Sequence, residues 1–153
     1  MQALYKVVFN RAGLRTTKMK PLVRRNDLVF HELSYQLVGY AYEMFDELGP
    51  GYSEKTYQTY ALLLRKNNHK YEKQVYYPVR FKNEIISRGF LDFQVEEKVI
   101  VELKKNELFS KTHIEQVLNY FVRTKLKLAI LFNFTKHGVR FKRIVNINQT
   151  VSP

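Results

Sequence analysis

The sequence predicts one α/β domain in which helices cover a mixed sheet, and two patterns carry this prediction. In some segments apolar residues recur at spacings of three and four, which is typical of amphipathic helices. In others they alternate with polar residues, or form short apolar runs between turn residues, as strands do. The predicted order is two N-terminal helices, three antiparallel strands, a crossover helix and two further strands.

Two helices are predicted at the start of the domain. The first spans about 27–48 and ends at Gly49-Pro50-Gly51, because glycine and proline terminate helices. The second spans about 53–66, with Ser53 as its N-cap. Their inward faces are formed by Leu33, Leu37, Tyr40 or Ala41, Met44 and Leu48 in the first helix and by Tyr57, Ala61 and Leu64 in the second.

Three antiparallel strands are predicted next, at about 71–81, 84–95 and 99–104. The turns between them are Lys82-Asn83 and Glu96-Glu97-Lys98. Pro78 has no backbone N–H to donate, so the first of these strands is expected at an edge of the sheet.

A crossover helix and two strands complete the prediction. Ser110 caps the helix, which runs to about Thr124 with Ile114, Val117, Leu118 and Phe121 facing inward. The apolar run 128–134 indicates a strand buried on both faces, and 139–147 follows it after a turn at Gly138. The helix is long enough to make a right-handed parallel connection, which makes the sheet mixed.

Composition narrows the class of protein. The 153 residues suffice for one domain with its own core, and the absence of cysteine excludes disulfides, thiolate catalysis and zinc–thiolate sites. No apolar run is long enough to span a bilayer and the N-terminus does not resemble a secretory signal, so we expect a cytoplasmic protein with no membrane partner. The net charge of +12 favours a polyanionic partner.

The basic residues are unevenly distributed, because residues 1–30 hold seven of them against one acidic residue. We interpret residues 1–25 as a basic N-terminal extension that could be disordered, and residues 26–150 as the folded domain. Other interpretations of this segment stay open. Met19 could be the true start, with residues 1–18 as an upstream extension. The segment could instead be a basic arm that contacts nucleic-acid backbone, or an organelle-targeting segment.

One predicted hairpin places two carboxylates together. Its simplest register pairs Val95 with Val99, Phe93 with Val101 and Asp92 with Glu102, and buries one apolar face formed by Leu91, Phe93, Val95, Val99, Val101 and Leu103. Facing carboxylates with Cβ atoms roughly 5 Å apart repel each other unless a cation or a proton lies between them. Mg²⁺ suits such a pair, and Lys104 lies two residues beyond Glu102 on the same face. This is the chemistry of metal-assisted phosphodiester hydrolysis.

The residues of this hairpin resemble a known signature. Asp92, nine further residues and then Glu102-Leu103-Lys104 resemble the motif of the PD-(D/E)XK nuclease superfamily, although Leu91 replaces the proline. The order of elements is similar to its restriction-endonuclease-like core. Over about residues 28–147 the chain further resembles the GxxExxY branch, in the blocks Gly51…Glu54…Tyr57, Gln116–Tyr120, Leu131–Phe134 and Lys142-Arg143-Ile144.

The resemblance implies a role for each matching residue. Asp92 and Glu102 would ligate Mg²⁺ or Mn²⁺, with the Leu103 carbonyl as a further ligand. Glu54 would aim a third carboxylate at the metal, directly or through water. Lys104 would position or activate the attacking water.

Other residues are expected to contact the substrate. Gln116 and Tyr120 share a helical face and resemble the QxxxY pair with which RecB-like nucleases contact the site and the DNA backbone. Basic side chains near the site would neutralise phosphates, and His113 could touch one, although a capping or solvent-facing role is the simpler reading. The basic residues concerned are Lys105, Lys111 and Arg123.

Simpler interpretations stay open at this point. Asp92 and Glu102 could be surface carboxylates, Glu54 could favour its helix N-terminus, and the QxxxY pair could be a polar helix edge. The function that we expect is a metal-dependent nuclease acting on DNA. Alternatives are a structure-specific, resolvase-type endonuclease, which would be a homodimer, and a non-catalytic nucleic-acid-binding module of the same fold.

Overall fold

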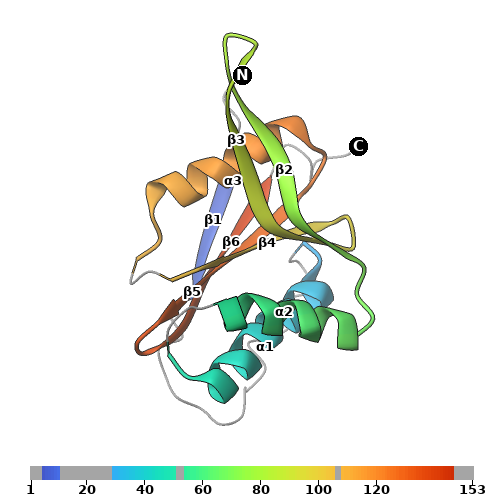
Figure 1. The fold of residues 1–153 in the computed structure, drawn as a ribbon, viewed down its shortest axis with the longest axis vertical. Helices are drawn as coiled ribbons and strands as arrows, with labels where there is room; N and C mark the ends of the chain where they lie inside the picture. Colours follow the sequence, from blue (N-terminus) through green and yellow to red (C-terminus); the bar gives the residue numbers. More distant parts are fainter. Residues whose placement is uncertain (1–4, 11–28, 51–53, 106–107, 147–153) are drawn as a thin grey trace.

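The computed structural model describes residues 5–10, 29–50, 54–105 and 108–146. It has three layers, in which a six-stranded sheet lies between helices α1 (His31–Leu48) and α2 (Glu54–Lys66) on one side and α3 (Lys111–Arg123) on the other (Figure 1). The strands are β1 (Tyr5–Asn10), β2 (Tyr71–Phe81), β3 (Glu84–Val95), β4 (Val99–Lys104), β5 (Leu128–Thr135) and β6 (Gly138–Asn146). The predicted α/β fold class is confirmed.

The sheet is mixed, with the strand order β1-β6-β5-β4-β3-β2. β4 and β5 are parallel and α3 connects them, whereas the other neighbouring pairs are antiparallel. β2 lies at an edge, as Pro78 predicted. β1 is an addition to the predicted sheet, because it pairs with β6 from within the segment that we interpreted as an extension.

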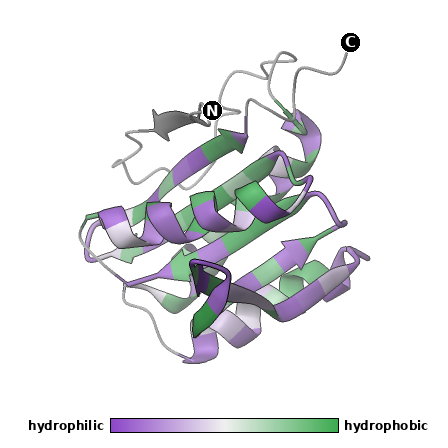
Figure 2. Cartoon of the chain, turned by 90° about the horizontal axis from the view of Figure 1, so that it is seen from above, coloured by the Kyte–Doolittle hydropathy of each residue, from purple (hydrophilic) through white to green (hydrophobic). Residues whose placement is uncertain are grey.

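Two cores lie against the two faces of the sheet. The larger joins α1 and α2 to the sheet, and we call this face the α1/α2 side; the smaller joins α3 to the opposite face, the α3 side. Figure 2 looks down on these layers and shows hydrophobic residues along the strands where helices cover them. None of the helices in the described ranges is long and apolar enough to cross a membrane.

The helix ends differ in detail from the prediction. α1 begins at His31 rather than near residue 27, because Phe30 adopts left-handed backbone angles (φ 50°) that cannot continue a helix. Leu48 was expected to face inward but is 47% exposed in the last turn. Ser110 caps α3 as predicted, since its hydroxyl accepts a hydrogen bond from the His113 N–H at 3.2 Å. The predicted N-cap Ser53 lies outside the described residues.

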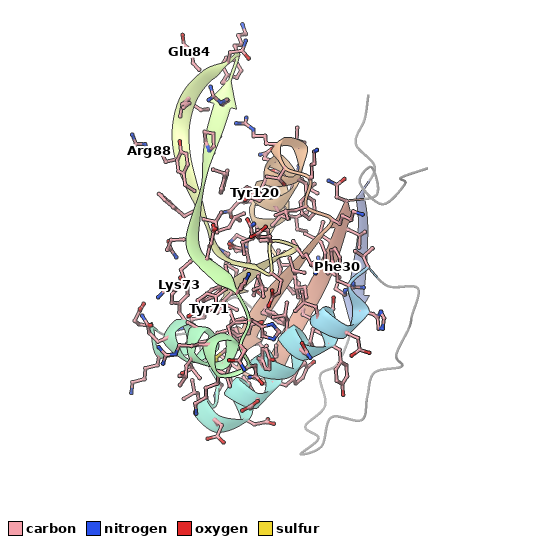
Figure 3. All side chains as sticks on the ribbon, turned by 90° about the vertical axis from the view of Figure 1, so that its right-hand side faces the viewer. Phe30, Tyr71, Lys73, Glu84, Arg88 and Tyr120 are labelled. Carbon is pink, nitrogen blue, oxygen red and sulfur yellow. The ribbon has the colours of Figure 1, made fainter. Side chains whose placement is uncertain are left out.

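β2 and β3 extend beyond the sheet as a two-stranded arm, which we define as residues 76–90. Figure 3 shows Glu84 at the tip of this arm and Tyr120 beside its base. Lys82 and Asn83 form its turn with φ values of 46° and 71°, as a tight hairpin with the native twist requires. Arg123 of α3 steadies the arm by donating to the Pro78 carbonyl oxygen at 2.9 Å.

Where the arm leaves the sheet, β3 changes the face to which its side chains point. Phe93 and Val95 pack on the α1/α2 side, but Leu91 packs on the α3 side. The prediction that these three share one buried face is therefore wrong for Leu91. The change falls at Asp92, and Gln74 at the same level of β2 has a φ of 52°. The local twist thus places Asp92 where side chains from both sides of the sheet can reach it.

Candidate active site

Asp92 and Glu102 lie where β3 and β4 separate. The predicted register holds, because Phe93 pairs with Val101 and Val95 with Val99, and the two carboxylates follow just beyond these pairs. Glu102 Oε1 accepts the Asp92 N–H at 2.7 Å, and Asp92 Oδ2 accepts the Leu103 N–H at 2.8 Å. Each carboxylate therefore replaces a backbone acceptor of the ladder, and this exchange fixes both side chains at the opening between the strands.

Lys104 completes the central group. Its Nζ lies 2.9 Å from Glu102 Oε2, and its side chain is 25% exposed against 2% for Glu102. A charge-assisted contact of this length is strong when one partner is buried. The ammonium thus has access both to the carboxylate and to solvent, where a substrate would arrive.

Burial and mutual repulsion perturb both carboxyl groups. Burial, followed by the Asp92 charge, raises the pKa of Glu102 to about 7, although Lys104 and the Asp92 N–H act in the opposite direction. Burial also raises the pKa of Asp92, against the hydrogen bond from Leu103 and the charge of Lys104. Raised pKa values on two neighbouring carboxyl groups are the pattern expected of a pair that shares a proton or binds a cation.

On the α1/α2 side the site is bordered by α2. Tyr57 donates from its hydroxyl to the Asp92 carbonyl oxygen at 3.4 Å and receives a hydrogen bond from Gln74 at the same distance. Glu54 lies one turn earlier and is exposed, with its Oε1 accepting from Gln58 at 2.8 Å. Among the described residues no three acidic or histidine side chains form a metal-binding group. A role of Glu54 at the metal, directly or through water, stays a prediction.

On the α3 side the QxxxY pair separates into two positions. Gln116 donates to the Phe90 carbonyl oxygen at 3.2 Å and lies beside the Tyr77 hydroxyl. Tyr120 is only 8% exposed, and its hydroxyl donates to Gln94 at 3.0 Å. Gln116 therefore borders the site, whereas Tyr120 is engaged in the packing beneath the arm, and its contact with a DNA backbone stays a prediction.

The residues expected to contact nucleic acid are dispersed. His113, in the first turn of α3, lies near Lys104; burial and then the Lys104 charge lower its pKa. Lys105 is exposed directly after β4, and Lys111 is 90% exposed with Glu115 at 3.6 Å. Arg123 is engaged with the arm at the far end of α3. Of these four, Lys105 directly follows Lys104 in the chain, and His113 lies close enough to Lys104 to be affected by its charge.

Two buried polar residues near the site had been given no role from the sequence. Asn133 is 0% exposed and pairs with Lys104 in the parallel register of β4 and β5. Lys142 of β6 is 8% exposed, and its ammonium lies over the Phe109 ring, 4.8 Å from the centroid. The sequence of β5 does single out Asn133, because this residue interrupts the apolar run 128–134.

The carboxylates have free oxygens that suit a hard divalent ion. Glu102 Oε2 has no partner but the Lys104 ammonium, and Asp92 Oδ1 accepts no hydrogen bond from the residues that the structure describes. Mg²⁺ and Mn²⁺ prefer oxygen ligands of this kind and retain waters in their other positions. Asp92 and Glu102 therefore fit such an ion. The carbonyl of Leu103 stays a predicted further ligand.

Comparison with known proteins gives one match. The family model described as the PD-(D/E)XK nuclease superfamily matches residues 31–144, which is most of the chain and includes the whole site. No curated protein and no solved structure matches this sequence.

Proposed function

Because this chain belongs to the PD-(D/E)XK nuclease superfamily, we propose that it is a divalent-metal-dependent nuclease that hydrolyses phosphodiester bonds in DNA. One observation supports this function above the others: Asp92 and Glu102 are locked together by reciprocal backbone hydrogen bonds with Lys104 at 2.9 Å from the second. A structural ion pair needs only one carboxylate. A second carboxylate with a raised pKa is explained by a cation that the pair is built to hold.

The chain's own residues would divide the work. Asp92 and Glu102 would hold Mg²⁺ or Mn²⁺, which when bound supplies Lewis-acid polarisation of the phosphate and lowers the pKa of a ligated water. Lys104 would orient the attacking water and offset negative charge as the phosphate becomes pentacovalent. Its partial exposure suits this role, because the ammonium must reach a phosphate that enters from solvent.

Neighbouring residues would hold the strand that carries the carboxylates. Tyr57 binds the Asp92 carbonyl from one side, and Gln116 binds the Phe90 carbonyl from the other. Two helices thus fix the same short stretch of β3, one at Asp92 and the other at Phe90. Positioning to within a fraction of an ångström is what metal-assisted catalysis requires of its supporting residues.

The test is cleavage of labelled linear, circular and branched DNA and of RNA, each with Mg²⁺, Mn²⁺ or EDTA. We expect metal-dependent cleavage of DNA that is lost in Asp92→Ala and kept in Glu84→Ala, which removes an exposed carboxylate at the tip of the arm. Both variants should retain the wild-type circular dichroism spectrum. Full activity in purified Asp92→Ala would refute the mechanism, and cleavage of branched substrates alone would favour a resolvase. Tight binding of DNA without cleavage under every condition would indicate a non-catalytic module.

A further inference from the structure

Asn133 is a buried amide whose polar atoms are unsatisfied. The residue is 0% exposed, and neither Oδ1 nor Nδ2 has a hydrogen-bond partner among the described residues. Burial of an unpaired amide costs free energy that an apolar side chain of the same shape would avoid. The neighbours of Asn133 along β5 are apolar, so the strand would accept leucine here. An amide at this position therefore calls for a partner that arrives in another state of the site.

Lys104 of the neighbouring strand β4 is a candidate partner. The two residues are paired in the parallel register of β4 and β5, where adjacent strands lie about 4.8 Å apart. They also point to the same face. Ile100 packs on the α3 side, as do Ala129 and Leu131, so alternation places Lys104 and Asn133 on that side too.

Lys104 needs a second partner if the carboxylates bind a metal. Its ammonium now contacts Glu102 Oε2 at 2.9 Å, which is an oxygen that the ion would take. A divalent ion binds carboxylate oxygens at about 2.0–2.1 Å and repels an ammonium at the same atom. We propose that the Asn133 side chain is the alternative hydrogen-bond partner of Lys104, and that the ammonium moves from Glu102 to Asn133 Oδ1 when the metal site fills.

This inference makes Asn133 a positioning residue for the proposed nuclease reaction, and it rests on that proposal only in requiring a divalent ion at Asp92 and Glu102. Asn133 would act in two ways. It would lower the cost of releasing Glu102 Oε2 to the ion, and it would hold the ammonium one strand away, beside the position of the attacked phosphate. His113 is the competing acceptor, because its Nδ1 is also buried with no hydrogen-bond partner in the described part of the chain, and its ring lies near Lys104.

A double-mutant cycle on Mn²⁺ affinity separates these possibilities without relying on catalysis. Free Mn²⁺ is measured by electron paramagnetic resonance in the full-length wild type, Asn133→Leu, Lys104→Met and the double variant. We expect Asn133→Leu to weaken Mn²⁺ binding by about tenfold, as loss of an outer partner of a metal site does. In the Lys104→Met background the same substitution should have no effect, because no ammonium then competes for Glu102. His113→Leu tests the competing acceptor and is expected to weaken Mn²⁺ binding less than Asn133→Leu does.

Each other outcome has a definite meaning. Equal Mn²⁺ affinity in wild type and Asn133→Leu overturns the inference, as does an equal loss in both backgrounds, which would show a role independent of Lys104. A Lys104-dependent loss in His113→Leu in place of Asn133→Leu would also overturn it, in favour of His113. Asn133→Leu should melt at or above the wild-type temperature without metal; if it melts earlier, Asn133→Ala replaces it in the cycle.

The cycle also distinguishes failure of this inference from failure of the proposed function. If the wild type binds Mn²⁺ and cleaves DNA but Asn133 and Lys104 show no coupling, only the inference about Asn133 is overturned. If the coupling is present but the wild type cleaves no nucleic acid, only the proposed function is overturned. A wild type that binds no Mn²⁺ overturns both.

Discussion

The two faces of the sheet differ most over the same few residues of β4, β5 and β6. Over residues 101–104, 132–134 and 141–142 the side chains that face the α1/α2 side are apolar, whereas the alternate ones on the α3 side are polar or charged. Of these polar side chains only that of Lys104, at 25%, is substantially exposed. The apolar set is Val101, Leu103, Phe132, Phe134 and Phe141, and the polar set is Glu102, Lys104, Asn133 and Lys142. Successive side chains of a strand point to opposite faces of the sheet. Residues that stabilise the core and residues proposed to act in catalysis therefore alternate along the same strands.

The largest expected effect comes from the polar face. Glu102→Gln keeps the shape of the side chain but removes the charge that holds a metal. We expect DNA cleavage to fall by at least about a thousandfold, as it does when a residue that acts on the reacting groups is lost. The unfolding free energy without metal should not fall at pH 8, because a buried charge is removed. Cleavage rates and thermal melts check the two parts, and a strongly destabilised variant would contradict the separation of the faces.

A matched substitution on the apolar face should lower stability and leave the cleavage rate largely unchanged. Phe132 is fully buried between the rings of Tyr60 and Phe141. Phe132→Ala should lower the unfolding free energy by about 3–5 kcal/mol through lost burial and the cavity that remains. At a temperature where the variant is still folded, the cleavage rate per folded molecule should stay within a few-fold of wild type. Chemical denaturation and active-site titration measure these quantities, and a stable but inactive variant would show that the faces are coupled.

The alternation that separates the faces was largely predictable from the sequence. The strand limits of the central hairpin, the register of Phe93 with Val101 and the edge position of β2 all follow from apolar periodicity and one proline. The change of facing at Asp92 was not predictable, because it depends on the twist with which the arm leaves the sheet. Leu91 therefore packs on the side opposite to the predicted one.

The candidate site was predictable in part for a similar reason. The alternation pattern placed Asp92, Glu102 and Lys104 together, because all three lie on one short hairpin. Tyr57 and Gln74 come from segments distant from Asp92 in the sequence, and no local sequence pattern predicts that they lie beside it. Asn133 could have been found, since a polar residue within a fully buried apolar strand is unusual.

The pH dependence should sharpen the contrast between the faces, because burial raises the pKa of Glu102 on the polar face to about 7. Burial raises the folded-state pKa of Glu102 to about 7, so the neutral carboxyl stabilises the metal-free protein below the unfolded pKa near 4.5, and this contribution is lost as the pH rises through about 7. Metal binding requires the charged form, so Mn²⁺ affinity should rise by up to about tenfold per pH unit below 7 and then level off. Comparison of wild-type and Glu102→Gln melts between pH 5 and 8 isolates the stability term. An identical pH dependence in the two proteins would mean that the Glu102 pKa is not raised.

The smallest effect that we predict concerns the base of the arm, where the α3 side admits an aromatic ring. Gly89 lies opposite Tyr77, and a Cβ at this position would collide with the Tyr77 ring and hydroxyl. Gly89→Ala should therefore lower the unfolding free energy by about 1–3 kcal/mol, as overpacking does, and should displace the ring beside Gln116. Tyr77→Leu should recover part of the stability of Gly89→Ala, because the smaller side chain leaves room for the methyl group. A loss of stability that Tyr77→Leu leaves unchanged would place the strain in the arm backbone instead.

The same substitutions should also affect cleavage, because Gln116 holds the Phe90 carbonyl two residues from Asp92. The cleavage rate should fall in Gly89→Ala, where the Tyr77 ring is displaced, and should recover when Tyr77→Leu removes that ring.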